Sequence, residues 1–120
     1  MPLKNGCRSE AEEQATLFRW AAYVPELKYM FAVPNGGSRH PAEAANLKRQ
    51  GVKAGVPDVC VPLPKGKYHG MYIEMKVGKN KATDKQLDWL RYLESVGYAT
   101  AVCYGFKEAK AAIISYLKEV

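Results

Sequence analysis

The sequence predicts an α/β protein in which a mixed β-sheet is flanked by helices. Two observations lead to this prediction. Amphipathic helical patterns alternate with short apolar extended runs along the chain, and glycine or proline separates them. The expected order is helix, strand, helix, strand, strand, helix, strand, helix. A chain of 120 residues without repeats or a linker is long enough for one core, so we expect a single domain over residues 1–120.

Most of these elements have a start or stop signal. Ser9-x-x-Glu12 and Thr83-x-x-Gln86 are capping boxes, each of which predicts the beginning of a helix. Pro41 suits the first position of a short helix, and Gly51 and Gly97 suit helix ends. The expected elements cover residues 9–23, 28–33, 41–50, 58–63, 70–76, 83–96, 98–103 and 106–118. The residues expected to face the core of the helices are Leu17, Phe18, Ala21, Leu87, Leu90, Leu93, Ala109, Ile113 and Leu117.

Composition restricts the classes of function. Lys and Arg number 18 against 12 Asp and Glu, which leaves a net charge of +6 and a pI of about 9.2. This balance suits a polyanionic partner such as nucleic acid, although RNA-binding and ribosomal proteins share it. The chain has no apolar stretch long enough to cross a membrane and no charged leader, so we expect a soluble, cytoplasmic protein.

The cysteines and histidines do not predict a zinc or redox site. Cys7, Cys60 and Cys103 are far apart and include no CxxC pair. Cys60 and Cys103 lie in apolar runs and are expected to be buried free thiols. His40 and His69 are isolated; a solvated loop explains His40 better than DNA contact does.

The pattern that carries chemistry joins two neighbouring strands. Asp58 follows Pro57 and opens one extended run, and Glu74 lies sixteen residues later, followed by Lys76. On a strand, Glu74 and Lys76 project to one face, and the apolar residues alternating with them project to the other. If residues 65–67 turn the chain between the two strands, Asp58 lies beside Glu74 and Lys76.

These three residue types suit metal-dependent hydrolysis of a phosphodiester. Two carboxylates can hold Mg²⁺, which usually keeps waters and substrate phosphate oxygens as its other ligands. An ammonium group beside the attacking water can orient it and neutralise developing charge. Each part alone is commonplace, since Pro-Asp turns and half-exposed strands are frequent. Their conjunction in a basic chain favours the catalytic interpretation.

With these motifs the chain resembles the VRR-NUC family of the PD-(D/E)xK nuclease superfamily over roughly Ser9 to Leu117. The resemblance implies a restriction-endonuclease-like core and a stand-alone nuclease of the type found in phages, similar to Holliday-junction resolvases. It implies Asp58, Glu74 and the Met75 carbonyl as metal ligands, and Lys76 as the catalytic lysine. The segments that carry it are Ser9-Glu10, Gln14, residues 33–37, residues 51–58, residues 73–76 and Gln86-x-x-Trp89-x-x-x-Leu93.

The resemblance also suggests roles for two further residues. Glu10 matches the family's helix glutamate best and could serve the metal directly or through water, with Glu13 as the rival. Both could instead simply complement the positive end of the helix. Gln86 resembles a family glutamine that approaches the active site, yet its place in a capping box is a sufficient structural reason. Lys53-Ala54 stands where relatives often carry a more basic pair.

The expected function is a Mg²⁺-dependent endonuclease that cuts branched DNA, with the four-way junction as its first substrate and Mn²⁺ able to replace Mg²⁺. The alternatives are a catalytically silent nucleic-acid-binding module, a flap or duplex nuclease and a restriction-like enzyme. The residues expected to contact DNA are Asn35, Arg39, Lys53, Lys79 and Lys81, although loop lysines are often merely solvated.

We also expect a homodimer, because a four-way junction has near two-fold symmetry and needs two opposed cuts. The candidates for its interface are aromatic, and each could equally belong to the monomer core: Tyr92, Tyr98, Tyr104, Phe106 and Tyr116.

Overall fold

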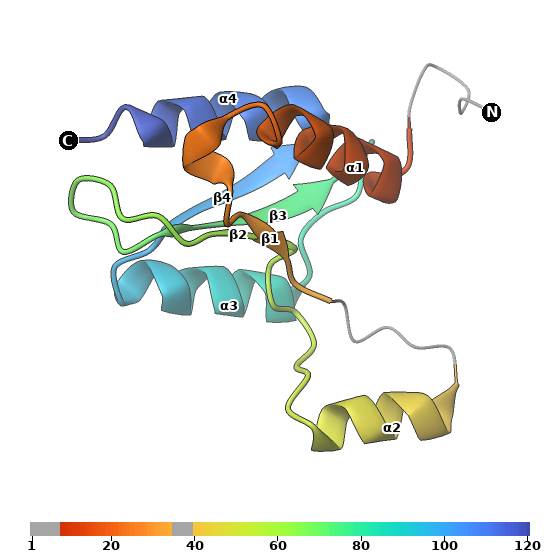
Figure 1. Ribbon diagram of the computed structural model, residues 1–120. Helices are drawn as coiled ribbons and strands as arrows, with labels where there is room; N and C mark the ends of the chain where they lie inside the picture. Colours follow the sequence, from red (N-terminus) through yellow and green to blue (C-terminus); the bar gives the residue numbers. More distant parts are fainter. Residues whose placement is uncertain (1–7, 35–39) are drawn as a thin grey trace.

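A four-stranded sheet in the order β1-β2-β3-β4 forms the centre of the molecule in the computed structural model, which describes residues 8–34 and 40–120 (Figure 1). β1, β2 and β3 pair antiparallel, whereas β3 and β4 pair parallel across the α3 connection, so the sheet is mixed as predicted. The elements are α1 (Glu10–Ala21), the 3₁₀ turn η2 (Pro25–Leu27), β1 (Phe31–Ala32), α2 (Pro41–Arg49), β2 (Val59–Val61), β3 (Met71–Lys76), α3 (Asp84–Ser95), β4 (Ala99–Tyr104) and α4 (Gly105–Leu117).

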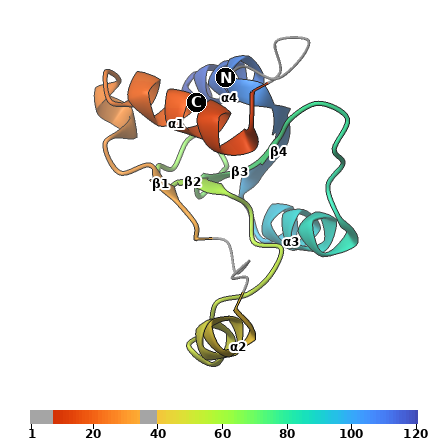
Figure 2. The same ribbon diagram turned by 90° about the vertical axis from the view of Figure 1, so that its right-hand side faces the viewer.

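The helices form layers on the two faces of the sheet. α1 and α4 lie together on one face and α3 lies on the other, as Figures 1 and 2 both show. α2 stands away from the sheet on the α3 side and has no buried residue. Both predicted capping boxes are formed, from Ser9 to Glu12 and from Thr83 to Gln86, and they fix where α1 and α3 begin.

The main core lies between the sheet and the α1–α4 layer. Strand residues such as Ile73 and Met75 meet residues of both helices there. Of the nine helix residues expected to face the core, six are buried: Leu17, Ala21, Leu90, Leu93, Ala109 and Ile113. Phe18, Leu87 and Leu117 are only partly buried. Near the end of α4, Tyr116 takes the fully buried position instead, and its hydroxyl donates to the Leu63 carbonyl at 2.6 Å.

The first two strands are shorter than predicted, for local reasons. The expected strand over residues 28–33 begins only at Phe31, because Pro25 starts a 3₁₀ turn whose hydrogen bonds continue to Met30. β2 covers three residues instead of the six expected. Pro57 and Pro62 flank it, and proline has no N–H to donate to a ladder, so it favours the ends of strands.

The two cysteines that the structure describes are free and buried, as expected. Burial raises the pKa of the Cys103 thiol to about 11, so it stays protonated and unreactive at neutral pH. Within residues 8–34 and 40–120, no helix has the length and apolar character needed to cross a membrane.

Candidate active site

The pairing of β2 with β3 brings Asp58 to Glu74. Val59 pairs with Ile73, so one further step of the same antiparallel register sets Asp58 opposite Glu74. Residues directly opposite in such a pair project to the same face. That face is the α3 side of the sheet, because Ile73 and Met75 alternate with Glu74 and belong to the core on the other side.

The Asp58 carboxylate is held by the backbone of β3. Its Oδ2 accepts a hydrogen bond from the Met75 N–H at 2.7 Å. Continuing the ladder would set Met75 opposite Pro57, but β2 does not extend that far, so the side chain of Asp58 takes over as the hydrogen-bond partner. The Asp58 carbonyl accepts from the Val33 N–H at 2.8 Å, which ties the same residue to the end of β1.

Glu74 is a buried carboxyl with one unpaired oxygen. The residue is only 2% exposed, and its Oε1 has no hydrogen-bond partner among the described residues. Oε2 lies 3.6 Å from the Nζ of Lys76. Burial raises the pKa of Glu74 to about 8; the neighbouring Asp58 carboxyl acts in the same direction and Lys76 opposes it. An unpaired buried oxygen is costly unless something binds it.

The enclosure of β3 goes beyond what the sequence predicted. The strand was predicted to have one apolar face and one face that carries Glu74 and Lys76. The alternation is correct, but Lys76 is only 7% exposed, so the polar face is enclosed as well. α3 packs on this side of the sheet and contacts both β3 and β4. The chemical groups therefore lie in a partly desolvated site, where charge interactions are stronger than in water.

The oxygen atoms at this site suit a hard divalent cation. In the described residues no three His, Cys, Asp or Glu side chains are arranged to hold a metal ion, so the candidate donors are the carboxylates of Asp58 and Glu74 with a backbone carbonyl. The N–H and C=O of one residue in an antiparallel strand point to the same side, so the Met75 carbonyl is directed toward Asp58. Carboxylate and carbonyl oxygens are the protein ligands that Mg²⁺ binds, usually together with waters and phosphate oxygens.

Comparison with known proteins identifies the family. The family model for the VRR-NUC domain matches residues 8–107. The chain belongs to the VRR-NUC family. A solved structure described as a VRR_NUC domain protein is 31% identical, has a TM-score of 0.81, and the match covers 93% of this chain and 90% of that one. No match was found among the curated proteins.

Membership confirms the predicted family and fold, and it makes the chain a nuclease-type domain with DNA as the implied substrate. Within this VRR-NUC domain, Glu10 lies near Asp58 and Glu74. It lines a cavity of about 540 Å³ together with Gln14 and Asp58. Its charge adds to the upward shift of the Glu74 pKa, although it does not complete a three-carboxylate cluster in the described residues.

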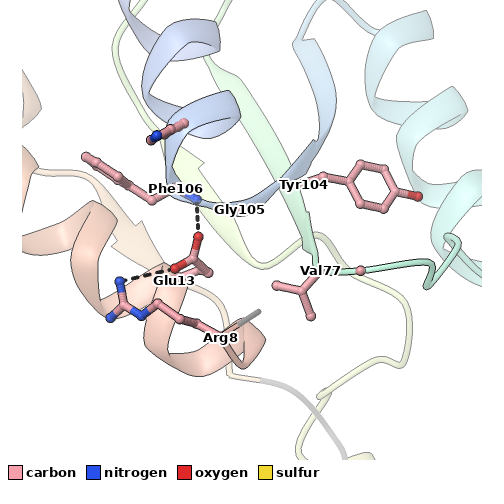
Figure 3. A pocket seen from close by; sticks show the side chains of 8 residues that line it. Arg8, Glu13, Val77, Tyr104, Gly105 and Phe106 are labelled. Carbon is pink, nitrogen blue, oxygen red and sulfur yellow. Dashed lines mark hydrogen bonds and ion pairs between the residues drawn. The ribbon is translucent and has the colours of Figure 1, made fainter. Parts of the chain in front are cut away.

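Glu13, the rival of Glu10, is occupied elsewhere (Figure 3). Its Oε1 accepts from the Phe106 N–H at 3.0 Å, and its Oε2 lies 3.2 Å from the Nη1 of Arg8. Gly105 opens α4 there with a φ of +89°, and a Cβ at this position would lie 2.8 Å from the Glu13 carboxylate. Glu13 thus caps α4 from another helix, at the edge of a cavity of about 380 Å³.

The remaining predicted residues are dispersed. The Oε1 of Gln86 accepts from the Thr83 N–H at 2.9 Å, so this atom serves the capping box. Lys79 and Lys81 are exposed in the loop after β3, where the Asn80 carbonyl accepts from the Tyr104 hydroxyl at 2.7 Å. Asn35 and Arg39 lie outside the described residues.

Lys53 lines a groove between α2 and α3, where it is joined by Lys85 and Trp89. Neither of these two was predicted as a site residue. Their spacing of four residues on one helix was the available signal, because it places both side chains on the same face. What the spacing could not reveal is the position of α2, which forms the opposite wall.

Proposed function

We propose that this chain is a Mg²⁺-dependent endonuclease that hydrolyses phosphodiester bonds in branched DNA, with the four-way junction as its preferred substrate. The proposal rests on one observation above all. The Asp58 carboxylate, the unpaired Oε1 of Glu74 and the ammonium group of Lys76 lie together in a partly desolvated site. Its site of action would be the cytoplasm.

Each residue would have a separate task in this reaction. Asp58 and Glu74 would hold Mg²⁺ with the Met75 carbonyl, and the ion would supply Lewis-acid activation of the phosphoryl group and of the attacking water. The ammonium group of Lys76 would orient that water and neutralise charge that develops in the transition state. Glu10, across the cavity from Asp58, would act on the same water network rather than as a direct ligand.

The decisive test is a cleavage assay on a panel of DNA substrates of equal length. The panel contains a four-way junction, a flap, a splayed arm and a plain duplex, each with Mg²⁺ and with a chelator. We expect the junction to be nicked fastest, and only with the metal. Preference for flaps or plain duplex would correct the substrate. Binding without nicking in Mg²⁺ or Mn²⁺ would replace the enzyme with a silent binding module.

Lys76→Ala tests the role of the lysine. Cleavage should fall by at least two orders of magnitude, because residues that act as a unit lose most of the rate together. DNA binding in Ca²⁺, a larger ion expected to support binding with little chemistry, should change little. Lys118→Ala is the control, since this lysine is exposed just beyond the end of α4. Cleavage retained by the Lys76 variant would exclude it from the reaction.

We further propose that two copies act together as a C2 dimer, which matches the near two-fold symmetry of a junction. Of the aromatic residues suggested for the interface, Tyr116 is wrong, since it is 4% exposed and belongs to the monomer core. Phe106 and Tyr98 are partly buried against Trp20 and Tyr72. Tyr92 and Tyr104 remain open, at 58% and 39% exposed.

We propose the edge of β1 as a better interface for the dimer. The sequence patterns did not indicate it. Tyr29 is 74% exposed and Phe31 is 48% exposed, and among residues 8–34 and 40–120 no strand pairs with the outer edge of β1. Sedimentation should give twice the chain mass at assay concentrations. The double variant Tyr29→Ser/Phe31→Ser should sediment with the mass of a single chain. Junction cleavage by the wild-type chain should give paired, symmetric nicks. Coupled cuts from a protein that sediments as a monomer would disprove the dimer.

A further inference from the structure

A groove of about 600 Å³ separates α2 from α3. We call it the α2–α3 groove; the residues used below are Lys48 on α2, Lys53 in the loop that follows, and Lys85, Asp88 and Trp89 on α3. Figures 1 and 2 show α2 standing clear of the sheet on the side of α3. The groove therefore lies on the face of the sheet to which Asp58 and Glu74 project.

The groove carries unneutralised positive charge. Lys48, Lys53 and Lys85 are all exposed, and none of them forms a salt bridge with any residue in the described ranges. Of the described residues that line the groove, Asp88 is the only acidic one. Three free ammonium groups against one carboxylate leave a local excess of about two positive charges, which suits a ligand with successive phosphates.

The groove also presents an aromatic surface. Trp89 is only partly buried and lines the groove directly. Its ring meets that of Tyr92 edge-on, with centroids 6.5 Å apart and an interplanar angle of 88°, and Tyr92 is itself 58% exposed. Exposed aromatic rings within a basic groove are the usual platform for stacking the bases of a single strand.

The groove is close to the candidate active site along the chain. Its wall at Lys53 leads to Asp58 within five residues, a span of at most about 17 Å for extended chain. This loop runs close against α3, because a Cβ at Gly55 would lie 3.0 Å from the Lys85 carbonyl group. DNA that occupied the groove would therefore reach the catalytic carboxylates within a few nucleotides.

We propose that the α2–α3 groove binds an unpaired stretch of the DNA substrate, with Trp89 stacked on a base and Lys48, Lys53 and Lys85 on the flanking phosphates. The volume suits a nucleotide-sized ligand rather than a duplex. Stacking also requires a base that is free of its partner strand. The inference rests on the proposed function and deepens it: the groove would bind bases that are unpaired at the branch point, which in a four-way junction means that base pairs at the crossover open.

Tryptophan fluorescence tests the groove without any cleavage. Trp20→Phe leaves Trp89 as the single tryptophan, since the chain has two. Oligo-dT should quench its emission. In the same background, Lys53→Ala/Lys85→Ala should weaken binding at least about tenfold and lower the salt slope by about 1.4, because each single-strand phosphate contact contributes about 0.7. The matched control, Lys28→Ala/Lys118→Ala, should change affinity less than about twofold.

A second measurement asks whether the groove reads unpaired DNA. With Ca²⁺, Trp89→Ala should weaken binding of a splayed arm by about fivefold or more, as expected for one lost stacked base, and binding of a blunt duplex by less than twofold. Trp89→Phe should restore most of the affinity. If Trp89→Ala does not fold, the Lys53→Ala/Lys85→Ala variant tests the proposed groove instead.

The outcomes separate this inference from the proposed function. The proposal for the groove would be overturned by absent quenching, by equal losses of affinity for the splayed arm and the duplex in Trp89→Ala, or by unchanged affinity in Lys53→Ala/Lys85→Ala. Any of these results would count against the groove even if the wild-type chain nicks junctions with Mg²⁺. Quenching with the expected variant effects would establish the groove, even if no substrate is cut and the nuclease proposal fails.

Discussion

Asp58 joins two roles in one side chain, an observed structural role and a proposed catalytic one. Asp58→Asn keeps an oxygen that can accept from the Met75 N–H but removes the charge that would hold Mg²⁺. Asp58→Ala removes both and leaves the backbone N–H of Met75 on β3 without its partner, which costs about 1–3 kcal/mol. We expect both variants to be inactive in nicking assays, and only the alanine variant to be clearly less stable in thermal denaturation. Equal stabilities of the asparagine and alanine variants would contradict the structural role of the Asp58 side chain.

Substitutions of Glu10 and Glu13 should affect different properties: those of Glu13 should affect stability, and those of Glu10 should affect the cleavage rate. Glu13→Ala removes the cap that the carboxylate provides to the Phe106 N–H, so unfolding free energy should fall by about 1 kcal/mol. Glu13→Gln can still accept that bond and should recover most of the loss. Glu10→Gln should lower the cleavage rate with little change in stability, because Glu10 faces the cavity at Asp58. Chemical denaturation and single-turnover cleavage of the same variants check both statements, and a reversed pattern would reassign the helix carboxylate.

At the scale of elements, the loop between α2 and β2 determines where Asp58 lies. Gly51 and Gly55 both have positive φ, at +99° and +90°, so alanine should cost about 1–2 kcal/mol at either position. Only at Gly55 does a Cβ also meet α3; nothing lies within 4 Å at Gly51. Gly55→Ala should therefore destabilise more than Gly51→Ala and should also slow cleavage. Melting temperatures and rates measured side by side test this difference, and equal effects would contradict a role for the contact with Lys85.

The order of elements could be predicted from the sequence because its signals are local. Capping boxes at Ser9 and Thr83 fixed two helix starts, and the alternation of β3 placed Glu74 and Lys76 on one face. Strand lengths were harder to predict from the sequence. β1 begins late because the residues before it form the hydrogen bonds of a 3₁₀ turn instead of a ladder. The burial of Glu74 and Lys76 depends on how α3 covers the sheet, which no local pattern contains.

The same contrast between local signals and contacts of distant elements applies to the candidate site. Asp58, Glu74 and Lys76 were predicted because adjacent antiparallel strands bring their side chains together. Whether Glu10 or Glu13 faces the site could not be decided, because both lie in the first turns of one helix. The distinction depends on Glu13 reaching Phe106, a contact that spans 93 residues. The α2–α3 groove was missed for a similar reason, since its two walls belong to different parts of the chain.

At the scale of the whole molecule, the buried carboxyl should govern how the metal-free protein responds to pH. The pKa of Glu74 is about 8 in the folded state, above its ordinary value of 4.5. The folded chain therefore binds this proton more tightly than the unfolded chain. The contribution is fully present below about pH 4.5, and it is lost as the pH rises toward 8. The loss should be on the order of a few kcal/mol.

The test compares the wild-type chain with Glu74→Gln in chelator, because the lowered pKa of the Glu12 carboxyl acts in the opposite direction in both chains. Between pH 5 and 8 the wild-type melting temperature should fall relative to that of the glutamine variant, which cannot ionise at this position. Parallel curves would refute the buried-carboxyl account. Adding Mg²⁺ at pH 8 should recover part of the difference in the wild-type chain only.

The hydrogen bond from Met75 to Asp58 also bears on copies of the chain that have not finished folding. If β2 separates from β3, Glu74 and Lys76 stay together on their strand, but Asp58 leaves with the other. A nascent or partly unfolded molecule would then lack one of the two carboxylates proposed to hold the metal. For a protein proposed to cut DNA inside the cell that makes it, this is a safeguard: the capacity to damage DNA would arise only in molecules whose central sheet is complete.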